Sequence, residues 1–258
     1  MMYLGGKSRI SKRLVAAILQ DCPVSRVWDP FCGGVSMTAA FARAGCRVLA
    51  SDIQPCLVSL YQGLLDGWTP PVEPITEEQY HAAKGLPDSD PLKAFIGYGV
   101  SFGGKYFAGY ALRKDSTRKP YCASTKISLD KDFRFIRGNA SFRVLSFLDV
   151  TPRPVDDVLI YCDPPYEGTT GYVTGAFGHR AFEARVRGWA DCGVPIYVSE
   201  YAVPDWADVV WSKDVALTVK RGSTERRVEL LWTPRGSSGE GEGGPSLRDR
   251  VAREGGMG

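Results

Sequence analysis

The chain has few of the residues from which structural metal sites are built. Its 258 residues include only two histidines, His81 and His179, which are far apart in the sequence. Seven cysteines are present, but no two of them form a C-x-x-C pair. Because zinc sites in proteins use closely spaced Cys and His ligands, we expect no metal site.

The cysteines are better explained by packing than by disulfide bonds. Their number is odd, and four of them, Cys32, Cys46, Cys56 and Cys162, lie in or beside segments that we expect to be buried. We interpret them as small hydrophobic residues in a reducing compartment. The sequence also contains no apolar run long enough to span a bilayer and no signal-like apolar segment at its start. We therefore predict a cytoplasmic location.

Positive and negative charges nearly balance over the whole chain. The net charge is only +3 and the sequence pI is about 8.4, so composition does not identify a nucleic-acid-binding protein and any basic signal must be local. Hydrophobic residues make up 44% and charged residues 24%, which is ordinary for a globular protein. The length fits one large domain or one domain with an inserted lobe.

The most informative stretch is Asp163-Pro164-Pro165-Tyr166. It follows five apolar residues, 158–162, that are rich in β-branched and aromatic types and indicate a buried strand. Proline cannot continue a central strand, so the chain should leave the sheet at Asp163. This places a carboxylate, a proline carbonyl and an aromatic ring at the carboxyl end of a strand, where open α/β sheets bind ligands.

This combination suits transfer of a group to the exocyclic amine of a base. Such an amine is a poor nucleophile because its lone pair is delocalised into the ring. A carboxylate and a backbone carbonyl that each accept one N–H bond would draw the nitrogen toward tetrahedral geometry, and a flat ring could stack on the base. The alternative is a strand-end turn that uses two prolines only to stop the strand.

A second group of signals predicts a nucleotide-type cofactor site. Residues 24–31 are expected to form the first strand, and Cys32-Gly33-Gly34 a tight turn into a helix that runs to Arg43. The turn is not G-x-G-x-x-G, which disfavours NAD. A second strand is expected over 47–50, and Asp52, just past its end, could hold a ribose diol or could instead cap the helix expected over 53–65.

The N-terminal segment Tyr3-Leu4-Gly5-Gly6-Lys7 precedes a predicted helix over residues 8–20. A glycine turn with a lysine at the start of a helix can hold an anionic group such as a carboxylate. The alternative is an ordinary turn with a solvated lysine.

Residues 67–145 do not continue the alternation of strands and helices. Short helices are expected after Thr76, which opens a capping box, and over 91–100. Glycines alternate with aromatic residues over 101–110, and residues 105–143 hold ten Lys or Arg against three Asp. Exposed aromatics with clustered positive charge can bind phosphates and unstacked bases, although a solvated loop with a few core aromatics is the competing interpretation.

The rest of the chain is expected to complete the sheet. Strands are expected over 142–147 and 195–199, with a helix over 179–192 between them in the chain. The last elements, 208–211, 216–220 and 227–232, suggest an antiparallel pair around residues 221–224. The Gly/Ser/Glu-rich residues 236–258 are expected to be disordered.

Taken together, these pieces resemble the Dam-type N6-adenine DNA methyltransferases, particularly their phage-encoded branch. The residues that carry the resemblance occur in family order over roughly residues 2–234. They are the N-terminal Tyr3-Leu4-Gly5-Gly6-Lys7, the motif Asp29-Pro30-Phe31-Cys32-Gly33-Gly34, the acidic Asp52, the segment 101–110, the motif Asp163 to Tyr166 and the closing segment Arg226-Arg227-Val228-Glu229-Leu230-Leu231.

The resemblance implies a Rossmann-like α/β methyltransferase sheet with an antiparallel closing strand. Residues 1–66 and 142–235 would form the catalytic domain, 67–141 an inserted, mostly helical DNA-recognition lobe, and 236–258 a tail. It implies S-adenosylmethionine as cofactor, double-stranded DNA as partner, a flipped adenine and direct in-line transfer. It also implies a monomer or weak dimer in the cytoplasm of a bacterium or a phage-infected cell. The cofactor-binding residues would be Tyr3, Lys7, Asp29, Phe31, Gly33, Asp52 and Asp163, the catalytic residues Asp163, Pro164, Pro165 and Tyr166, and the DNA-binding residues Lys105, Tyr106, Arg113, Lys114, Arg118 and Lys119.

The sequence departs from the better-known branch in the reading loop, where Gly104-Lys105-Tyr106-Phe107 replaces an Asn/Arg-bearing segment associated with GATC. The recognition sequence is therefore open, as is the role of Glu200 in Ser199-Glu200-Tyr201. Two other functions stay open as well: a methyltransferase that acts on RNA or on a protein amide, and a non-catalytic nucleic-acid-binding protein. The size and local charge of the inserted lobe favour duplex DNA, and the presence of both Asp52 and Asp163 favours catalysis.

Overall fold

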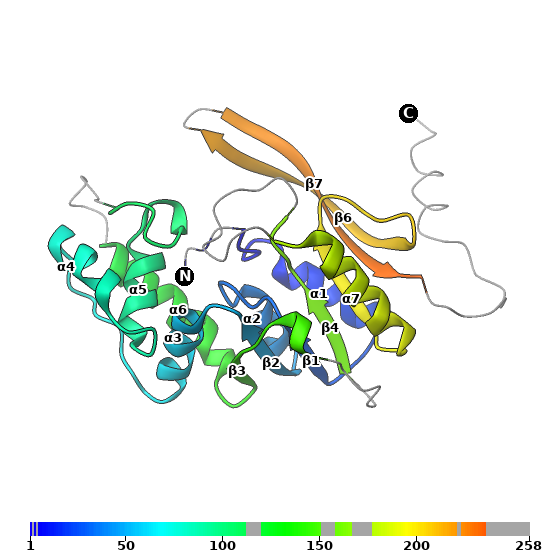
Figure 1. The fold of residues 1–258 in the computed structure, drawn as a ribbon, viewed down its shortest axis with the longest axis horizontal. Coiled ribbons are helices and arrows are strands. Elements are labelled where there is room, and N and C mark those ends of the chain that lie inside the picture. Colours follow the sequence, from blue (N-terminus) through cyan, green and yellow to red (C-terminus); the bar gives the residue numbers. More distant parts are fainter. Residues whose placement is uncertain are drawn as a thin grey trace.

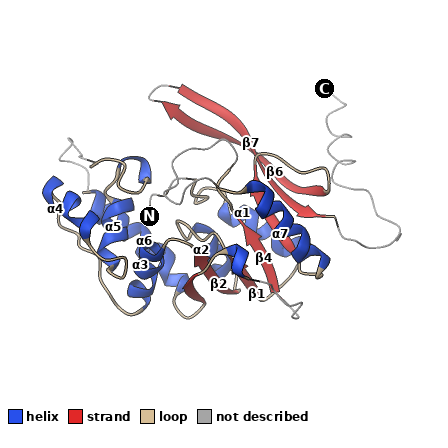
Figure 2. Cartoon of the chain, viewed as in Figure 1, coloured by secondary structure: helices blue, strands red, loops and turns tan. Residues whose placement is uncertain are grey.

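The computed structural model describes residues 1, 3, 5–111, 120–150, 158–166, 177–220 and 223–235, with only the backbone described for 215–220 and 223–227. Within these residues, seven strands form one mixed sheet (Figures 1 and 2). Four of the predicted DNA-binding residues, and the predicted disordered tail 236–258, lie outside the described residues; the four are Arg113, Lys114, Arg118 and Lys119.

The strand order is β3-β2-β1-β4-β5-β7-β6. The first five strands in this order run parallel, while β7 is antiparallel to both β5 and β6. The sheet is therefore an open α/β sheet that ends in an antiparallel hairpin, which confirms the predicted fold class. The strands are β1 (Arg26–Asp29), β2 (Arg47–Asp52), β3 (Ala140–Val144), β4 (Val158–Cys162), β5 (Ile196–Glu200), β6 (Ala207–Lys220) and β7 (Ser223–Pro234).

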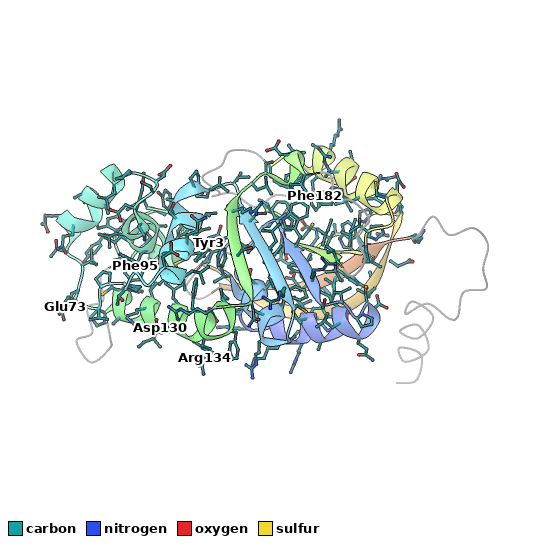
Figure 3. All side chains as sticks on the ribbon, turned by 90° about the horizontal axis from the view of Figure 1, so that it is seen from below. Tyr3, Glu73, Phe95, Asp130, Arg134 and Phe182 are labelled. Carbon is teal, nitrogen blue, oxygen red and sulfur yellow. The ribbon has the colours of Figure 1, made fainter. Side chains whose placement is uncertain are left out.

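Helices cover both faces of the sheet, as the view in Figure 3 shows. One face of the sheet packs against α1, α2 and α6, and the other face packs against α7. None of the helices in the described part of the chain is long and apolar enough to cross a membrane. The helices are α1 (Ser11–Asp21), α2 (Ser36–Arg43), α3 (Pro55–Leu65), α4 (Glu77–Ala82), α5 (Pro91–Gly99), α6 (Tyr121–Ile136) and α7 (His179–Asp191).

Successive strand residues alternate between the two cores, as the period of two in a strand requires. In β4, Leu159 and Tyr161 face the core under α1, α2 and α6, while Ile160 and Cys162 face the core under α7. A strand buried on both faces reads as a continuous apolar run, which is the pattern that predicted β4. Cys32, Cys46, Cys56 and Cys162 are buried, as expected.

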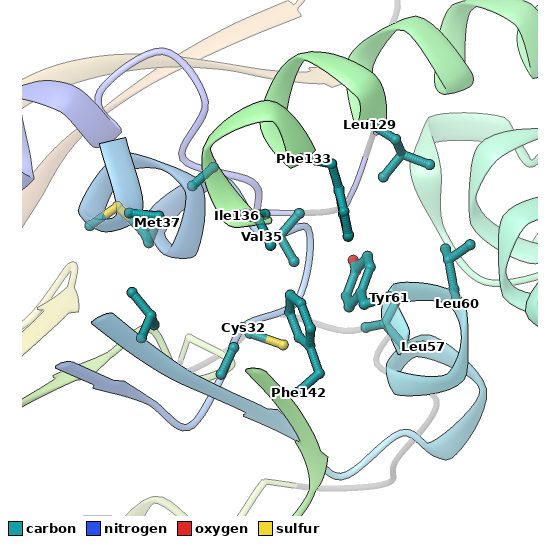
Figure 4. Close-up of a cluster of buried hydrophobic side chains, with 14 of the residues drawn as sticks. Cys32, Val35, Met37, Leu57, Leu60, Tyr61, Leu129, Phe133, Ile136 and Phe142 are labelled. Carbon is teal, nitrogen blue, oxygen red and sulfur yellow. The ribbon is translucent and has the colours of Figure 1, made fainter. Parts of the chain in front are cut away.

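The first core extends from the sheet into the helices of the region 67–141 (Figure 4). In Figure 4, Tyr61 of α3 lies beside Phe133 of α6 and Phe142 of β3. Its ring centroid is 6.0 Å from that of Phe133 and 5.0 Å from that of Phe142, and the two phenylalanine rings stack with centroids 6.1 Å apart. In Figure 1 the short helices α4 and α5 lie beyond α3, on the β3 side of the sheet. Aromatic packing therefore joins this region firmly to the edge of the sheet.

The predicted capping box at Thr76 is confirmed. The Thr76 hydroxyl accepts a hydrogen bond from the Gln79 amide at 3.2 Å, and the Gln79 side chain accepts one from the Thr76 amide at 2.9 Å. The helix predicted over 91–100 is also confirmed as α5, which begins with Pro91 at a position where its missing N–H has no cost.

Several predicted element boundaries were wrong. The first strand covers only Arg26–Asp29 rather than 24–31, because the chain leaves the sheet early to make the glycine turn. The strand predicted over 142–147 pairs instead over Ala140–Val144, and Phe147 begins a 3₁₀ turn, Phe147–Asp149, whose N-cap is Ser146. The segments 208–211 and 216–220 form one long strand, β6, which is irregular between Val209 and Trp211.

The helix α6 was not predicted, although its sequence carries a helical signal. Its buried residues recur at intervals of three and four, which is the spacing of one helical face. Polar and β-branched residues lie between them, so hydrophobicity alone does not show the helical spacing. The buried residues are Cys122, Thr125, Leu129, Phe133 and Ile136.

Candidate active site

The Asp163 turn lies at the point where the strand order reverses. The strands β1 and β4 are neighbours, but β2 continues the sheet on one side of them and β5 on the other. Asp163 directly follows β4, and the glycine turn at Gly33 follows β1. Crevices outside the carboxyl ends of strands at such a reversal are where open α/β sheets bind ligands, so both predicted motifs occupy one ligand-binding edge.

The turn after β1 requires glycine because Tyr3 packs on it. Gly33 has a φ of +39°, and a Cβ there would lie 2.8 Å from the Tyr3 ring. A Cβ on Gly34 would lie 2.7 Å from the Tyr3 Cβ atom. Any side chain at either position would therefore displace Tyr3. Tyr3 and the glycine turn, which are separate in sequence, therefore form one surface.

Asp29, the last residue of β1, is buried beneath this turn. The Thr38 hydroxyl donates a hydrogen bond to Oδ2 of Asp29 at 2.6 Å. The other oxygen, Oδ1, has no hydrogen-bond partner among the described residues. Burial raises the pKa of Asp29 to about 7, despite the Thr38 bond, which lowers it. A buried carboxylate with an unpaired oxygen is the kind of group that a bound ligand can satisfy.

Asp52 connects the second strand to the glycine turn. It is the last residue of β2 rather than a residue just past the strand. Its Oδ2 accepts a hydrogen bond from the Gly33 amide at 3.2 Å, and Oδ1 accepts one from the Gln54 amide at 3.0 Å. The helix α3 has Gln54 as its N-cap, so Asp52 is not the N-cap that the alternative interpretation required. Burial raises the pKa of Asp52 to about 6.

The Asp163 turn is held by the buried Lys7. Its ammonium Nζ lies 2.7 Å from Oδ1 of Asp163 and contacts the hydroxyl of Tyr166. The same ammonium lies 4.5 Å from the centre of the Tyr166 ring. Lys7 is 5% exposed, so this is a desolvated ion pair rather than a surface contact. It was predicted only as a cofactor contact; the structure also places it on Asp163 and Tyr166, which were predicted as catalytic residues.

A fourth side chain completes this cluster. Glu229 of β7 lies 3.3 Å from the Lys7 ammonium through Oε1, and the same oxygen accepts a hydrogen bond of 2.5 Å from the Tyr166 hydroxyl. Glu229 belongs to the closing segment of the sequence motifs but was not predicted as a site residue. Its signal was a single acidic residue inside the apolar run Val228 to Trp232, where a charge is unexpected unless it is paired.

The cluster contains more negative than positive charge. Burial raises the pKa of Asp163, and Lys7 only partly offsets that rise. Burial likewise raises the pKa of Glu229. Desolvation lowers the pKa of Lys7, but the two carboxylates outweigh it and the net direction is upward. Lys7 is therefore charged at neutral pH and shared between two carboxylates.

Glu200 adds a further acidic group at the end of β5. It is half-buried, and its Oε1 accepts a hydrogen bond of 2.9 Å from the Tyr201 amide. Burial raises its pKa to about 7, and the charge of Asp163 contributes to that rise. The ring of Tyr201 in turn meets that of Tyr166 edge to face, with centroids 4.5 Å apart. Glu200 therefore lies in the electrostatic field of the site rather than on a remote surface.

The predicted residues do not all fall into this arrangement. The ring of Phe31 packs in an aromatic cluster on the α7 side, 5.2 Å from Phe147 and 5.7 Å from Phe182 between ring centroids. Tyr106 packs 4.9 Å from Tyr98, and its hydroxyl accepts a bond from the thiol of Cys56 at 3.3 Å. A cofactor role for Phe31 and a DNA role for Tyr106 stay predictions.

Tyr98 links the two regions and was not predicted as important. Its ring lies 5.1 Å from that of Tyr3, on the glycine turn, and 4.9 Å from that of Tyr106. A continuous set of aromatic contacts therefore runs from the glycine turn into segment 101–110. In that segment Lys105 is half-buried, while Phe102 is 74% exposed. Among the described residues there is no cluster of three or more potential metal ligands.

Comparison with solved structures finds methyltransferases at low similarity. An RNA methyltransferase candidate from Pyrococcus horikoshii is 10% identical, with a TM-score of 0.42, over 88% of this chain and 83% of the other. Magnesium protoporphyrin IX methyltransferase from Synechocystis, with bound S-adenosylmethionine, is 10% identical with a TM-score of 0.39, over 90% and 81%. A methyltransferase candidate from Escherichia coli is 11% identical with a TM-score of 0.39, over 89% and 88%.

No curated protein matches the sequence significantly. A family model does match: that of the D12 class N6 adenine-specific DNA methyltransferases, over residues 3–90. The match contains Tyr3, Lys7, the glycine turn and Asp52, which meet at one edge of the sheet. Residues 3–90 thus carry the signature of the D12 class N6 adenine-specific DNA methyltransferases, as the sequence motifs predicted.

Proposed function

We propose that this protein transfers a methyl group from S-adenosylmethionine to the N6 amine of adenine in a short sequence of duplex DNA. The observation that carries the proposal is the Asp163-Pro164-Pro165-Tyr166 turn, fixed by Lys7 at the strand-order reversal beside the glycine turn. The family match over residues 3–90 supports the adenine in DNA as target.

The residues around the glycine turn fit the cofactor. The unpaired Oδ1 of Asp29 offers a buried acceptor, and the Tyr3 ring, which packs on Gly33 and Gly34, would border the cofactor. Asp52 accepts two backbone bonds, but an ionised carboxylate has about four acceptor sites, so it retains capacity for ribose hydroxyls. When bound, S-adenosylmethionine supplies an electrophilic methyl group.

The catalytic turn would orient the target amine. Lys7 contacts Oδ1 of Asp163, which leaves the carboxylate with further acceptor sites. Asp163 and the carbonyl of Pro164 would each accept one N–H of the amine and so localise its lone pair on nitrogen. The ring of Tyr166, next to Pro165, would stack on the base. Rate enhancement would come mainly from positioning and electrostatics.

The target must leave the helix for this chemistry, because the amine of a stacked, paired adenine cannot reach a buried carboxylate. We propose that the base is flipped into the edge lined by Asp163 and Tyr166. The region 67–141 would hold the duplex, through Lys105 and Tyr106 and the basic residues that follow. The aromatic contacts through Tyr98 connect that region to the glycine turn.

The test is methyl transfer from labelled cofactor to unmethylated genomic DNA, followed by single-molecule mapping of modified bases. We expect N6-methyladenine in one short motif for the wild type and none for Asp163→Ala, with DNA binding largely retained by that variant. Asp208→Asn is a matched control, because Asp208 forms a surface ion pair with Arg235 at 3.0 Å.

The outcomes separate the alternatives. Cofactor binding without DNA methylation would refute the DNA substrate and favour an RNA or protein amide. Failure to bind the cofactor would favour a non-catalytic nucleic-acid-binding protein. Full turnover by Asp163→Ala would remove Asp163 from the reaction.

A further inference from the structure

We infer that Glu229 is a positioning residue for methyl transfer: it holds the hydroxyl of Tyr166 and the ammonium of Lys7 so that Asp163 keeps the orientation and the charge needed to accept an amine. The inference rests on the proposed function and assigns a role in it to the closing strand of the sheet.

Three separate parts of the chain meet at one oxygen atom. Oε1 of Glu229 accepts the Tyr166 hydroxyl at 2.5 Å and lies 3.3 Å from the Lys7 ammonium. Lys7 itself reaches Oδ1 of Asp163 at 2.7 Å. Glu229 is 3% exposed and Lys7 5%. The catalytic turn is therefore tied to β7 as well as to the N-terminal segment.

Stability alone does not explain a glutamate at this position. Burying an ion pair removes two charges from water, and well-packed apolar residues of similar volume are often as stable or more so. The neighbours of Glu229 along β7 include Leu231, which is fully buried in the core under α1 and α2. An apolar residue at 229 would continue that pattern but would leave the Tyr166 hydroxyl and the Lys7 ammonium with one acceptor fewer.

The sharing of Lys7 affects how Asp163 behaves. With two carboxylates around one ammonium, Asp163 is only partly neutralised and remains a strong hydrogen-bond acceptor. Without Glu229, Lys7 would pair with Asp163 alone and weaken its attraction for a target amine. Tyr166 would also lose the acceptor that fixes its hydroxyl, and the ring would be less well placed. Both effects act on the chemical step rather than on cofactor binding at the glycine turn.

The charged and titratable groups that face Glu229 come from every neighbouring element. Lys213 stands opposite Glu229 in the register of β6 and β7. Burial raises the pKa of Glu229, while Lys7 lowers it and Asp163 raises it. Removing its negative charge should therefore lower the pKa of Asp163 and of Lys7. Among the residues whose side chains the structure describes, these groups are Lys7, Tyr161, Asp163, Tyr166, Glu200 and Lys213.

The experiment compares Glu229→Gln with the wild type, because glutamine keeps the shape and one acceptor oxygen but removes the charge. We expect kcat to fall about 10- to 100-fold, as misplaced catalytic groups typically cause, while KM for cofactor and for DNA changes less than about threefold. The acid limb of the kcat profile should move to lower pH, because Asp163 loses a negative neighbour. Asp208→Asn, also in the hairpin, should change neither kcat nor the position of the acid limb.

A combined variant tests whether the two residues act together. If Glu229 works through Tyr166, then Glu229→Gln with Tyr166→Phe should lose no more activity than the worse single variant. If the activity losses of the two single variants multiply in the double variant, Glu229 does not act through Tyr166. Unchanged kcat and an unchanged pH profile for Glu229→Gln, beside an active wild type, would overturn the inference itself.

A second measurement does not depend on activity. The pKa of the Lys7 ammonium can be followed by NMR in protein with labelled lysine, with Lys7→Arg used to assign the signal. It should fall in Glu229→Gln relative to the wild type and stay unchanged in Asp208→Asn. If the wild type methylates no DNA, the proposed function fails, and this titration decides separately whether Glu229 controls Lys7: an unchanged pKa would overturn the inference.

Discussion

Replacing Lys7 by methionine should expose the electrostatic balance of the site. Lys7 lies 2.7 Å from Asp163 and 3.3 Å from Glu229. At an effective dielectric constant of about 20, each of these pairs has a gross attraction of roughly 5–6 kcal/mol. Much of that attraction is offset by the loss of hydration of three buried charges. Methionine has a similar length but no charge, so the two carboxylates would remain buried and uncompensated.

Removing one partner of a buried pair typically lowers stability by about 3–5 kcal/mol, and we expect a loss of that size in the free energy of unfolding at mildly alkaline pH. The loss should shrink at mildly acidic pH. Without Lys7, the folded-state pKa values of Asp163 and Glu229 lie further above their unfolded values. Such groups favour folding when protonated, and that contribution is lost as the pH rises through the folded-state pKa.

Urea denaturation in mildly acidic and mildly alkaline buffer measures both effects. Lys93→Met is the matched control, because Lys93 lies 2.7 Å from Asp88 in a pair that is partly open to solvent, with the Lys93 side chain 16% and the Asp88 side chain 53% exposed. A surface pair contributes about 0–1 kcal/mol, so that variant should lose little at either pH. A loss below about 1 kcal/mol for Lys7→Met at both pH values would refute the reasoning, because it would mean that the carboxylates do not depend on Lys7.

Three further predictions concern binding. Gly34→Ala should weaken cofactor binding by at least about tenfold in calorimetry, because its Cβ would lie 2.7 Å from Tyr3; unchanged affinity would show that Tyr3 can move freely. Cofactor affinity should fall as the pH drops through about 7 and then about 6, where Asp29 and Asp52 in turn take up a proton. Asp52→Asn should bind weakly and lose only the part of that dependence near pH 6. Replacing Lys105 together with the basic residues at 113–119 should reduce the salt slope of DNA binding by up to about 0.9 for each phosphate that the variant no longer neutralises, whereas an unchanged slope would place the duplex elsewhere.

The sequence alone determined the elements that depend on local chemistry. Two prolines after an apolar run located the end of β4 and therefore Asp163, because proline cannot pair within a central strand. The capping box at Thr76 and the proline at the start of α5 predicted helix starts, because these signals act within one turn. Gly33 and Asp52 were predicted to share one cofactor site, because the carboxyl ends of neighbouring parallel strands meet at one edge of a sheet.

Only the tertiary structure showed which distant side chains surround the Lys7 ammonium. Lys7, Asp163 and Glu229 come from the N-terminal segment, a mid-chain turn and the last strand, and no local pattern relates them. A lone glutamate in an apolar strand signals a buried partner, but the identity of that partner depends on β7 inserting between β5 and β6. Strand order is set by packing of the whole sheet, so the sequence could indicate the carboxylate of Asp163 while only the fold could show the groups that hold it.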